Sequence, residues 1–278
     1  MIINFLIIIQ AVTMYVMGID IGSASSKAVI LKDGRELAAS AVVQAGTGTS
    51  GPDRMLKEIF EQSGLKRSDI ACITGTGYGR YSLEIADKQV SEISCHAKGI
   101  HFMLPNVRTI LDIGGQDVKA IAIDENGNVN NFFMNDKCAA GTGRFLDVMA
   151  RILEIDVSEM AAWDERSQEE VTVSSTCTVF AESEVISLLS QKYKKEDIIR
   201  GIHNSVISRA AGLLYRTAME EDVAITGGVA KNAGVVRALE RELKHPVYVA
   251  EKPQITGAVG AALFAWQAYQ KTLQQKGV

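Results

Sequence analysis

The chain has 278 residues, of which 47% are hydrophobic and 22% charged, so it is long enough for one large or two modest domains with hydrophobic cores. This composition excludes a disordered or fibrous protein. A formal net charge of -4, without a long basic run, argues against a nucleic-acid partner. The 24 glycines, 4 prolines and 6% aromatic residues favour an α/β fold with many tight turns.

The amino terminus is apolar through Val16, but Asn4, Gln10 and Thr13 interrupt the run. It is also shorter than the roughly 20 residues that a membrane-spanning helix needs, and it lacks the basic start of a secretory signal. We therefore expect no membrane segment and treat residues 1–14 as a non-essential extension, with Met14 or Met17 as the alternative start. An added strand or a weak membrane contact is the other interpretation.

Two segments repeat one pattern in the same register. Asp20-Ile21-Gly22 is followed by Lys27-Ala28-Val29, and Asp112-Ile113-Gly114 is followed at the same offset by Lys119-Ala120-Ile121. In each copy an apolar run leads into the aspartate, and a turn of small residues leads into a second β-branched run. The pattern predicts two hairpins, with strands at 15–19 and 28–31 and at 107–111 and 118–123.

The turn of each hairpin has the residues of a phosphate-binding loop. Glycines at such turns adopt positive φ and bring backbone N–H groups close to phosphate oxygens. The expected donors are the amides of Gly22, Gly114 and Gly115 and the hydroxyls of Ser23, Ser25 and Ser26. Asp20 and Asp112 end the strands before the turns, where an acid engages Mg²⁺ through water. Two such hairpins facing each other would form a nucleotide cleft, whereas two ordinary structural turns are the alternative.

The four cysteines are too sparse for a secreted disulfide framework, which predicts reduced thiols and a cytoplasmic protein. Cys72 lies in an apolar strand and Cys95 on a predicted helix after Val90, so we expect both in the core. Cys138 and Cys177 instead lie near predicted helix starts, with helices over 145–153 and from near Ser183 to Leu189.

Helix starts stabilise thiolates, so Cys138 and Cys177 are candidate metal ligands. A [4Fe–4S] cluster needs four thiolates, and a twofold dimer would supply two from each copy. From cysteine spacing alone, a Cys138–Cys177 disulfide, a zinc site and two unrelated buried thiols stay open.

A third glycine turn follows near the carboxyl end. Residues 222–226 are predicted to form a buried strand, Gly227-Gly228 a turn and residues 229–243 an amphipathic helix. Lys231 and Asn232, at that helix start, are candidates to contact a sugar or base. Small residues at 256–262 predict a last helix that lets two backbones approach closely, with Gln254 just ahead of it.

These turns resemble those of the actin, Hsp70 and sugar-kinase superfamily. The first phosphate loop matches Gly18 to Lys27, the second Asp112 to Asp117 and the adenosine loop Thr226 to Ala230. The resemblance implies an α/β fold of two ribonuclease-H-like lobes with an ATP cleft between them. We place the first lobe at residues 15–98 and the second at 99–278, which includes the cluster ligands, the adenosine loop and the carboxyl-terminal helix. A Walker A sequence is absent.

Three longer motifs, at 86–97, 135–147 and 177–184, resemble the activator component of 2-hydroxyacyl-CoA dehydratases, in the BadF/BadG/BcrA/BcrD ATPase family. That family includes ATP-dependent subunits of benzoyl-CoA reductase. The resemblance implies a homodimer with one bridging [4Fe–4S] cluster on Cys138 and Cys177. It also implies an ATPase that takes one electron from reduced ferredoxin or flavodoxin and passes it to a separate dehydratase.

The same resemblance implies an ATP site. Its residues would be Ser23, Ala24, Ser25, Ser26, Lys27, Gln116, Gly228, Lys231 and Gln254. We further expect Asp20, Asp112 and Asp117 to hold Mg²⁺ or water, and Gln116 to orient the attacking water. A small-molecule kinase similar to N-acetylglucosamine kinase is the alternative function, and a non-catalytic nucleotide-sensing regulator is a third.

Overall fold

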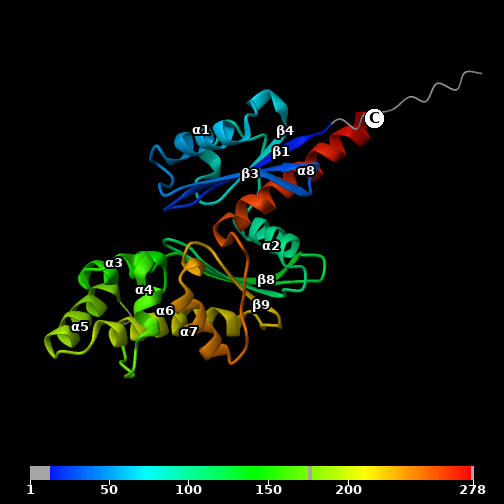
Figure 1. The fold of residues 1–278 in the computed structure, drawn as a ribbon. Helices are drawn as coiled ribbons and strands as arrows, with labels where there is room; N and C mark the ends of the chain where they lie inside the picture. The colour runs from blue at the N-terminus through cyan, green and yellow to red at the C-terminus, as the bar shows by residue number, and fades with distance from the viewer. Residues whose placement is uncertain (1–12, 175–176, 277–278) are drawn as a thin grey trace, which may run out of the picture.

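The computed structural model describes residues 13–174 and 177–276 and contains two five-stranded sheets (Figure 1). The first sheet has the order β3-β2-β1-β4-β5 and the second the order β10-β9-β6-β7-β8. In each sheet the earliest strand is central, antiparallel to the next strand and parallel to the fourth. The two halves of the chain therefore share one topology.

The strands of the first sheet are β1 Tyr15–Ile21, β2 Ser26–Lys32, β3 Glu36–Val43, β4 Ile70–Thr76 and β5 Lys88–Gln89. Those of the second sheet are β6 Thr109–Ile113, β7 Val118–Ile123, β8 Val129–Asn135, β9 Val223–Thr226 and β10 Tyr248–Val249. None of the helices in the described ranges is both long enough and apolar enough to span a bilayer. The predicted extension at residues 1–14 falls almost wholly outside these ranges.

Both predicted hairpins are confirmed, with strand bounds that differ from the predicted ones by a few residues. The β1–β2 register places Asp20 opposite Lys27, and the β6–β7 register places Asp112 opposite Lys119. The lysine Nζ lies 3.2 Å from the Asp20 carboxylate in the first copy and 3.4 Å from the Asp112 carboxylate in the second. The sequence repeat is therefore a structural repeat with the same ion pair in each copy.

Helices cover both faces of the first sheet. Because successive side chains of a strand point to opposite faces, Met17 packs against α1 (Gly51–Ser63) and Val16 against α8 (Thr256–Lys276). The last helix of the chain thus lies on the sheet built by the first residues (Figure 1).

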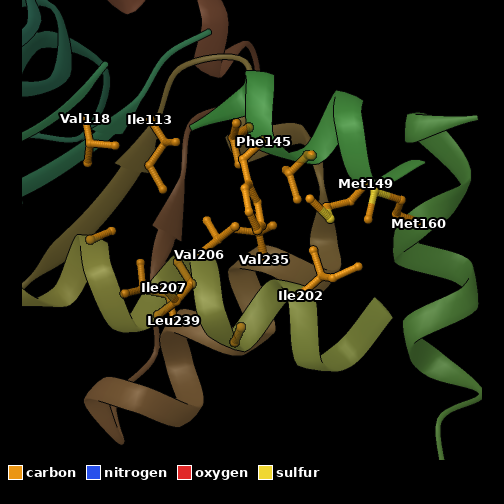
Figure 2. Close-up of a cluster of buried hydrophobic side chains, with 14 of the residues drawn as sticks. Ile113, Val118, Phe145, Met149, Met160, Ile202, Val206, Ile207, Val235 and Leu239 are labelled. Carbon is orange, nitrogen blue, oxygen red and sulfur yellow. The ribbon is translucent and has the colours of Figure 1, made fainter. Parts of the chain in front are cut away.

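The second sheet has α2 (Glu92–Met103) on one face and a larger helical layer on the other. This layer consists of α3 Gly143–Ile152, α4 Met160–Glu165, α5 Thr178–Ser190, α6 Lys195–Arg216 and α7 Ala233–Leu243. Figure 2 shows Phe145 of α3 directed toward Val206 of α6 and Val235 of α7. These buried contacts form the main core of the second lobe.

Glycines let α2 and α8 cross at contact distance. A Cβ on Gly99 would collide with the carbonyl oxygen of Thr256, and one on Gly260 with that of Cys95. The predicted close approach of the small-residue helix is therefore confirmed. Its partners are the backbone of α2 and that of β1, where Gly18 faces Ala258.

Two predicted helix starts were wrong. The helix expected near Ser183 begins at Thr178, because the extended backbone of Cys177 already forms its N-cap. The helix expected from Val229 begins as a 3-10 turn at Val229–Lys231, and α7 starts only at Ala233. Asn232 separates the two because its side chain caps α7.

The positive φ expected at Gly22, Gly114 and Gly115 was also wrong. Among the glycines of the three turns, Gly227 has positive φ, at 85°. Gly114 and Gly115 are needed for space instead, since a Cβ would collide with the Asp117 carboxylate at one and with the Ala24 side chain at the other. The Ala24 contact brings the turns of the two hairpins directly together.

Candidate functional site

A cavity of about 470 Å³ lies where the turns of the two sheets converge. The predicted residues on its wall are Asp20, Gly22, Ser23, Ala24, Ser25, Lys27, Asp112, Gly114, Gly115, Asp117, Gly227, Gly228, Lys231 and Gln254. Both phosphate turns, the glycine turn after β9 and the approach to α8 thus contribute to one site. Glycine turns beside Lys27, Lys119 and Lys231 suit a ligand that carries phosphate groups.

Two predicted residues are not among those on the wall. Ser26 is fully buried, and its hydroxyl donates to the carbonyl oxygen of Ala45 at 2.7 Å, so it braces the first turn from behind. Gln116 is exposed on the second turn, next to Gly115. The remaining predicted residues of both turns line the cavity.

A buried lysine holds three carboxylates at the cavity. Lys119 Nζ lies 2.9 Å from Asp117, 3.4 Å from Asp112 and 3.5 Å from Glu92. Burial acts to lower the pKa of Lys119, but Asp112, Asp117 and Glu92 raise it above its ordinary value. The ammonium group therefore stays charged although only 3% of Lys119 is exposed.

Asp112 stays ionised in the same buried cluster. Burial acts to raise its pKa, but the nearby His96, Lys119 and the Thr226 hydroxyl bring it down to about 2. That hydroxyl donates to Asp112 Oδ1 at 2.8 Å, and His96 Nδ1 lies 3.5 Å from the same oxygen. The cavity floor is thus a fixed array of opposite charges.

The sequence interpretation missed several residues on the wall, including Gln44, Tyr78, Glu92 and His96. Glu92 and His96 lie on α2, where Ser91 caps the helix by accepting the N–H of Ser94. Burial raises the pKa of Glu92 above its ordinary value. The motif at 86–97 includes both residues, but which side chains face a cavity depends on where α2 packs.

The four cysteines divide as predicted. Cys72 and Cys95 are buried, and burial raises the pKa of Cys72 and brings that of Cys95 to about 12, so both are inert core thiols. Cys138 and Cys177 are exposed. All four are free, so the structure has no Cys138–Cys177 disulfide.

Arg209 of α6 interacts electrostatically with both exposed cysteines. Burial lowers the pKa of its guanidinium, and the Cys138 and Cys177 thiols and Glu184 oppose that shift. Within the described ranges no three His, Cys, Asp or Glu side chains are grouped to hold a metal ion. One copy of this part of the chain therefore offers a pair of thiols rather than a complete ligand set.

The cavity and the segment that carries Cys138 are joined through α3. The amides of Gly143 and Arg144, in the first turn of α3, donate to the carbonyl oxygens of Gly114 and Gly115, each at 2.9 Å. Cys138 lies in the segment between β8 and this helix. The second phosphate turn and the Cys138 segment are thus attached to the same helix end.

Comparison with known proteins identifies a family of ATPases for this chain. The family model described as the BadF/BadG/BcrA/BcrD ATPase family matches residues 17–265. The chain belongs to this family. It is 63% identical to the activator of lactoyl-CoA dehydratase from Anaerotignum propionicum, over 93% of this chain and 100% of that protein.

Comparison with solved structures identifies the fold of the chain. The activator of the 2-hydroxyisocaproyl-CoA dehydratase from Clostridium difficile, with bound ADPNP, is 54% identical with a TM-score of 0.92, covering 95% of this chain and 98% of that one. A putative N-acetylglucosamine kinase from Chromobacterium violaceum is 13% identical with a TM-score of 0.53, covering 91% and 99%. The kinase shares the fold alone. The expected α/β fold of two lobes is therefore confirmed.

Proposed function

We propose that this protein is an ATP-hydrolysing iron–sulfur activator that passes an electron from reduced ferredoxin or flavodoxin to a partner 2-hydroxyacyl-CoA dehydratase. The observation that carries the proposal is the attachment of α3 to the second phosphate turn, because α3 directly follows Cys138. A small-molecule kinase requires the cavity but has no use for exposed thiols linked to it. The close relationship to dehydratase activators supports the same choice.

ATP would occupy the cavity between the two proposed lobes, residues 15–98 and 99–278, with α8 of the second lobe packed on the sheet of the first. Its phosphates would contact the turns at Ser23 to Lys27 and at Gly114-Gly115, and its adenosine the wall at Gly227, Gly228, Lys231 and Gln254. Lys27 and Lys119 already contact the carboxylates of Asp20, Asp112 and Asp117. These acids therefore fit a Mg²⁺ held through water better than a directly bound ion.

Gln116 is our candidate for orienting the water that attacks ATP. It follows Gly115 on the second turn and is exposed, so its amide is free to swing toward a bound nucleotide. In Gln116→Ala we expect loss of ATP-driven electron transfer while the cluster absorbance is retained. Unchanged turnover would refute this role.

Cys138 and Cys177 fit the ligand set of a [4Fe–4S] cluster shared by a homodimer. Both are free and exposed, both interact electrostatically with Arg209, and two copies supply four thiolates. When bound, such a cluster accepts and donates single electrons. A centre held between subunits would be sensitive to oxygen, which suits the cytoplasm of an anaerobe.

The deciding measurement is iron per dimer in protein purified without oxygen. We expect about four iron atoms per dimer in the wild type, as a [4Fe–4S] cluster requires. Cys138→Ser and Cys177→Ser should lose iron, whereas Cys72→Ser and Cys95→Ser serve as core controls that retain it. Colourless, monomeric protein would overturn the proposal, and ADP release that depends on a sugar would identify a kinase.

A further inference from the structure

A buried histidine lies behind the wall of the cavity, outside the charged cluster. His203 of α6 and Asp164 of α4 are both fully buried, and His203 Nδ1 lies 3.4 Å from Asp164 Oδ1. The other ring nitrogen, Nε2, lies 3.2 Å from Asn232 Nδ2. Asn232 itself lines the cavity, so these three side chains form a row that leads inward from its wall.

The cap of α7 determines which way the Asn232 amide points. Its Oδ1 accepts the N–H groups of Gly234 and Val235, at 2.9 Å and 3.3 Å, so Nδ2 is the atom that faces His203. An amide nitrogen donates only, and His203 Nε2 must therefore accept and carry no proton. Burial lowers the pKa of His203, in keeping with a neutral ring. The one ring proton is then on Nδ1, toward Asp164.

Asp164 is held in place by a second contact with α7. Arg237 Nη2 donates to Asp164 Oδ2 at 2.7 Å, so α7 is tied to Asp164 directly and also through the His203–Asn232 pair. Burial acts to raise the pKa of Asp164, but His203 and Arg237 bring it down to about 2. Gly234 completes the fit, since a Cβ there would collide with the His203 ring.

We infer that His203 is a positioning residue for the nucleotide: as the Nδ1–H tautomer it fixes the Asn232 amide on the cavity wall and thereby the start of α7. The inference rests on the proposed function only in taking the ligand to be a nucleotide. One N–H of Asn232 goes to His203, and no described residue accepts the other. That second N–H is available to an acceptor of the nucleoside, a ribose hydroxyl or a ring nitrogen.

The tautomer is tested on the apo protein by long-range ¹H–¹⁵N correlation spectra of ¹⁵N-histidine-labelled material. His203→Gln assigns its signals among the 4 histidines of the chain. We expect a protonated Nδ1 and an unprotonated Nε2 at neutral pH, with the Nε2 signal shifted in Asn232→Ala because its hydrogen bond is lost while Asp164 still favours the proton on Nδ1. A protonated Nε2 in the wild type would overturn the inference, because that ring cannot accept from Asn232.

The effect of His203 on nucleotide binding is tested by calorimetric titration with ADP. His203→Phe and Asn232→Ala should each weaken ADP binding by about threefold to tenfold, the range expected for one hydrogen bond, and the double variant should be no weaker than the weaker single variant. His203→Gln, which keeps an acceptor for Asn232, should bind ADP more tightly than His203→Phe. Ile202→Ala, a core neighbour on α6, is the control for general destabilisation.

Equal ADP affinities of the wild type and His203→Phe, or full additivity in the double variant, would overturn the inference while leaving the nucleotide site intact. Absence of ADP binding in the wild type would instead contradict the proposed function. Should His203→Phe not fold, the tautomer and its response to Asn232→Ala still decide the outcome.

Discussion

The backbone amide of Gly143 donates to the carbonyl oxygen of Gly114 at 2.9 Å, which ties the first turn of α3 to the second phosphate turn. On the other side of this bond, the amide and hydroxyl of Thr142 both donate to the carbonyl oxygen of Ala139, at 3.1 Å and 2.6 Å. The path from the second phosphate turn to Cys138 runs through this hydrogen bond and then back along residues 143–138. It is therefore short, and the Thr142–Ala139 hydrogen bonds hold it in place. A shift of Gly114 on nucleotide binding would reach the Cys138 thiol through few rotatable bonds.

Gly143→Pro should weaken the link between the nucleotide and the Cys138 thiol, although the hydrogen bond from Arg144 to Gly115 stays in place. Proline is tolerated in the first turn of a helix, and Thr142 already has the extended backbone that precedes proline. Its ring carbon takes the place of the N–H that reaches Gly114, so the Gly114 oxygen, 2.9 Å from that nitrogen, must move aside. We expect ADP to bind up to about tenfold more weakly, and the difference between ADP and ADPNP in the rate at which iodoacetamide modifies Cys138 to be smaller than in the wild type.

The matched control is Gly143→Ala. It adds a Cβ at the same position, 3.2 Å from the Gly114 oxygen, but keeps the N–H. We expect it to retain the nucleotide-dependent difference in Cys138 modification. A difference in Gly143→Pro as large as in the wild type would show that the coupling does not depend on the Gly143–Gly114 hydrogen bond.

Lys119→Met should destabilise the protein by about 3–5 kcal/mol, because it leaves the carboxylates of Asp112, Asp117 and Glu92 without their shared buried cation. Lys32→Met removes an exposed pair with Glu36 and should cost under about 1 kcal/mol. The free energy of unfolding from urea titrations measures both. Equal effects of the two substitutions would contradict a buried charge cluster.

Lys119→Met should also reverse the direction in which the free energy of unfolding changes with pH in acid. In the wild type the pKa of Asp112 is about 2, below its unfolded value, so the stability it contributes is present above about pH 4 and lost as the pH falls toward 2. Without Lys119, repulsion and burial should raise the folded pKa of these acids above the unfolded values. The free energy of unfolding of Lys119→Met should then increase between pH 6 and 4, on the order of 1 kcal/mol per unit.

Arg209→Gln should lower the reduction potential of the proposed cluster, on the order of tens of millivolts, because a cation that interacts with both thiols favours the more negative reduced state. Arg216→Gln, on the same helix but beside the Phe133 ring, is the control and should leave the potential unchanged. A spectroscopic redox titration measures both. Equal potentials in the wild type and Arg209→Gln would exclude this influence.

Alanine substitutions at two helical glycines should have opposite effects on the melting temperature. Gly260→Ala places a Cβ on the Cys95 carbonyl and should cost about 1–3 kcal/mol through overpacking. Gly212→Ala, near the carboxyl end of α6, meets nothing within 4 Å and should stabilise the protein by about 0.5–1 kcal/mol. A melting temperature that rises in both would show that α2 and α8 are not in tight contact.

The amino-acid sequence by itself determined the two hairpins and the assignment of the cysteines. In each copy an apolar run leads into the aspartate and a lysine follows at the same offset, and this repeat indicated the register that the two hairpins share. The apolar neighbours of Cys72 and the position of Cys95 on a predicted helix likewise indicated that both are buried. These features depend on residues close together in the chain.

Only the tertiary structure decided how distant segments meet. The packing of α8 on the first sheet, the positions of Glu92 and His96 on the cavity wall, and the electrostatic interaction of Arg209 with both exposed cysteines join residues far apart in sequence. No local period specifies such contacts, because they depend on the angles at which helices pack on sheets. The glycines of the second phosphate turn are a further example. The sequence predicted that glycine is needed there, but only the structure gave the reason, which is steric contact with Asp117 and Ala24.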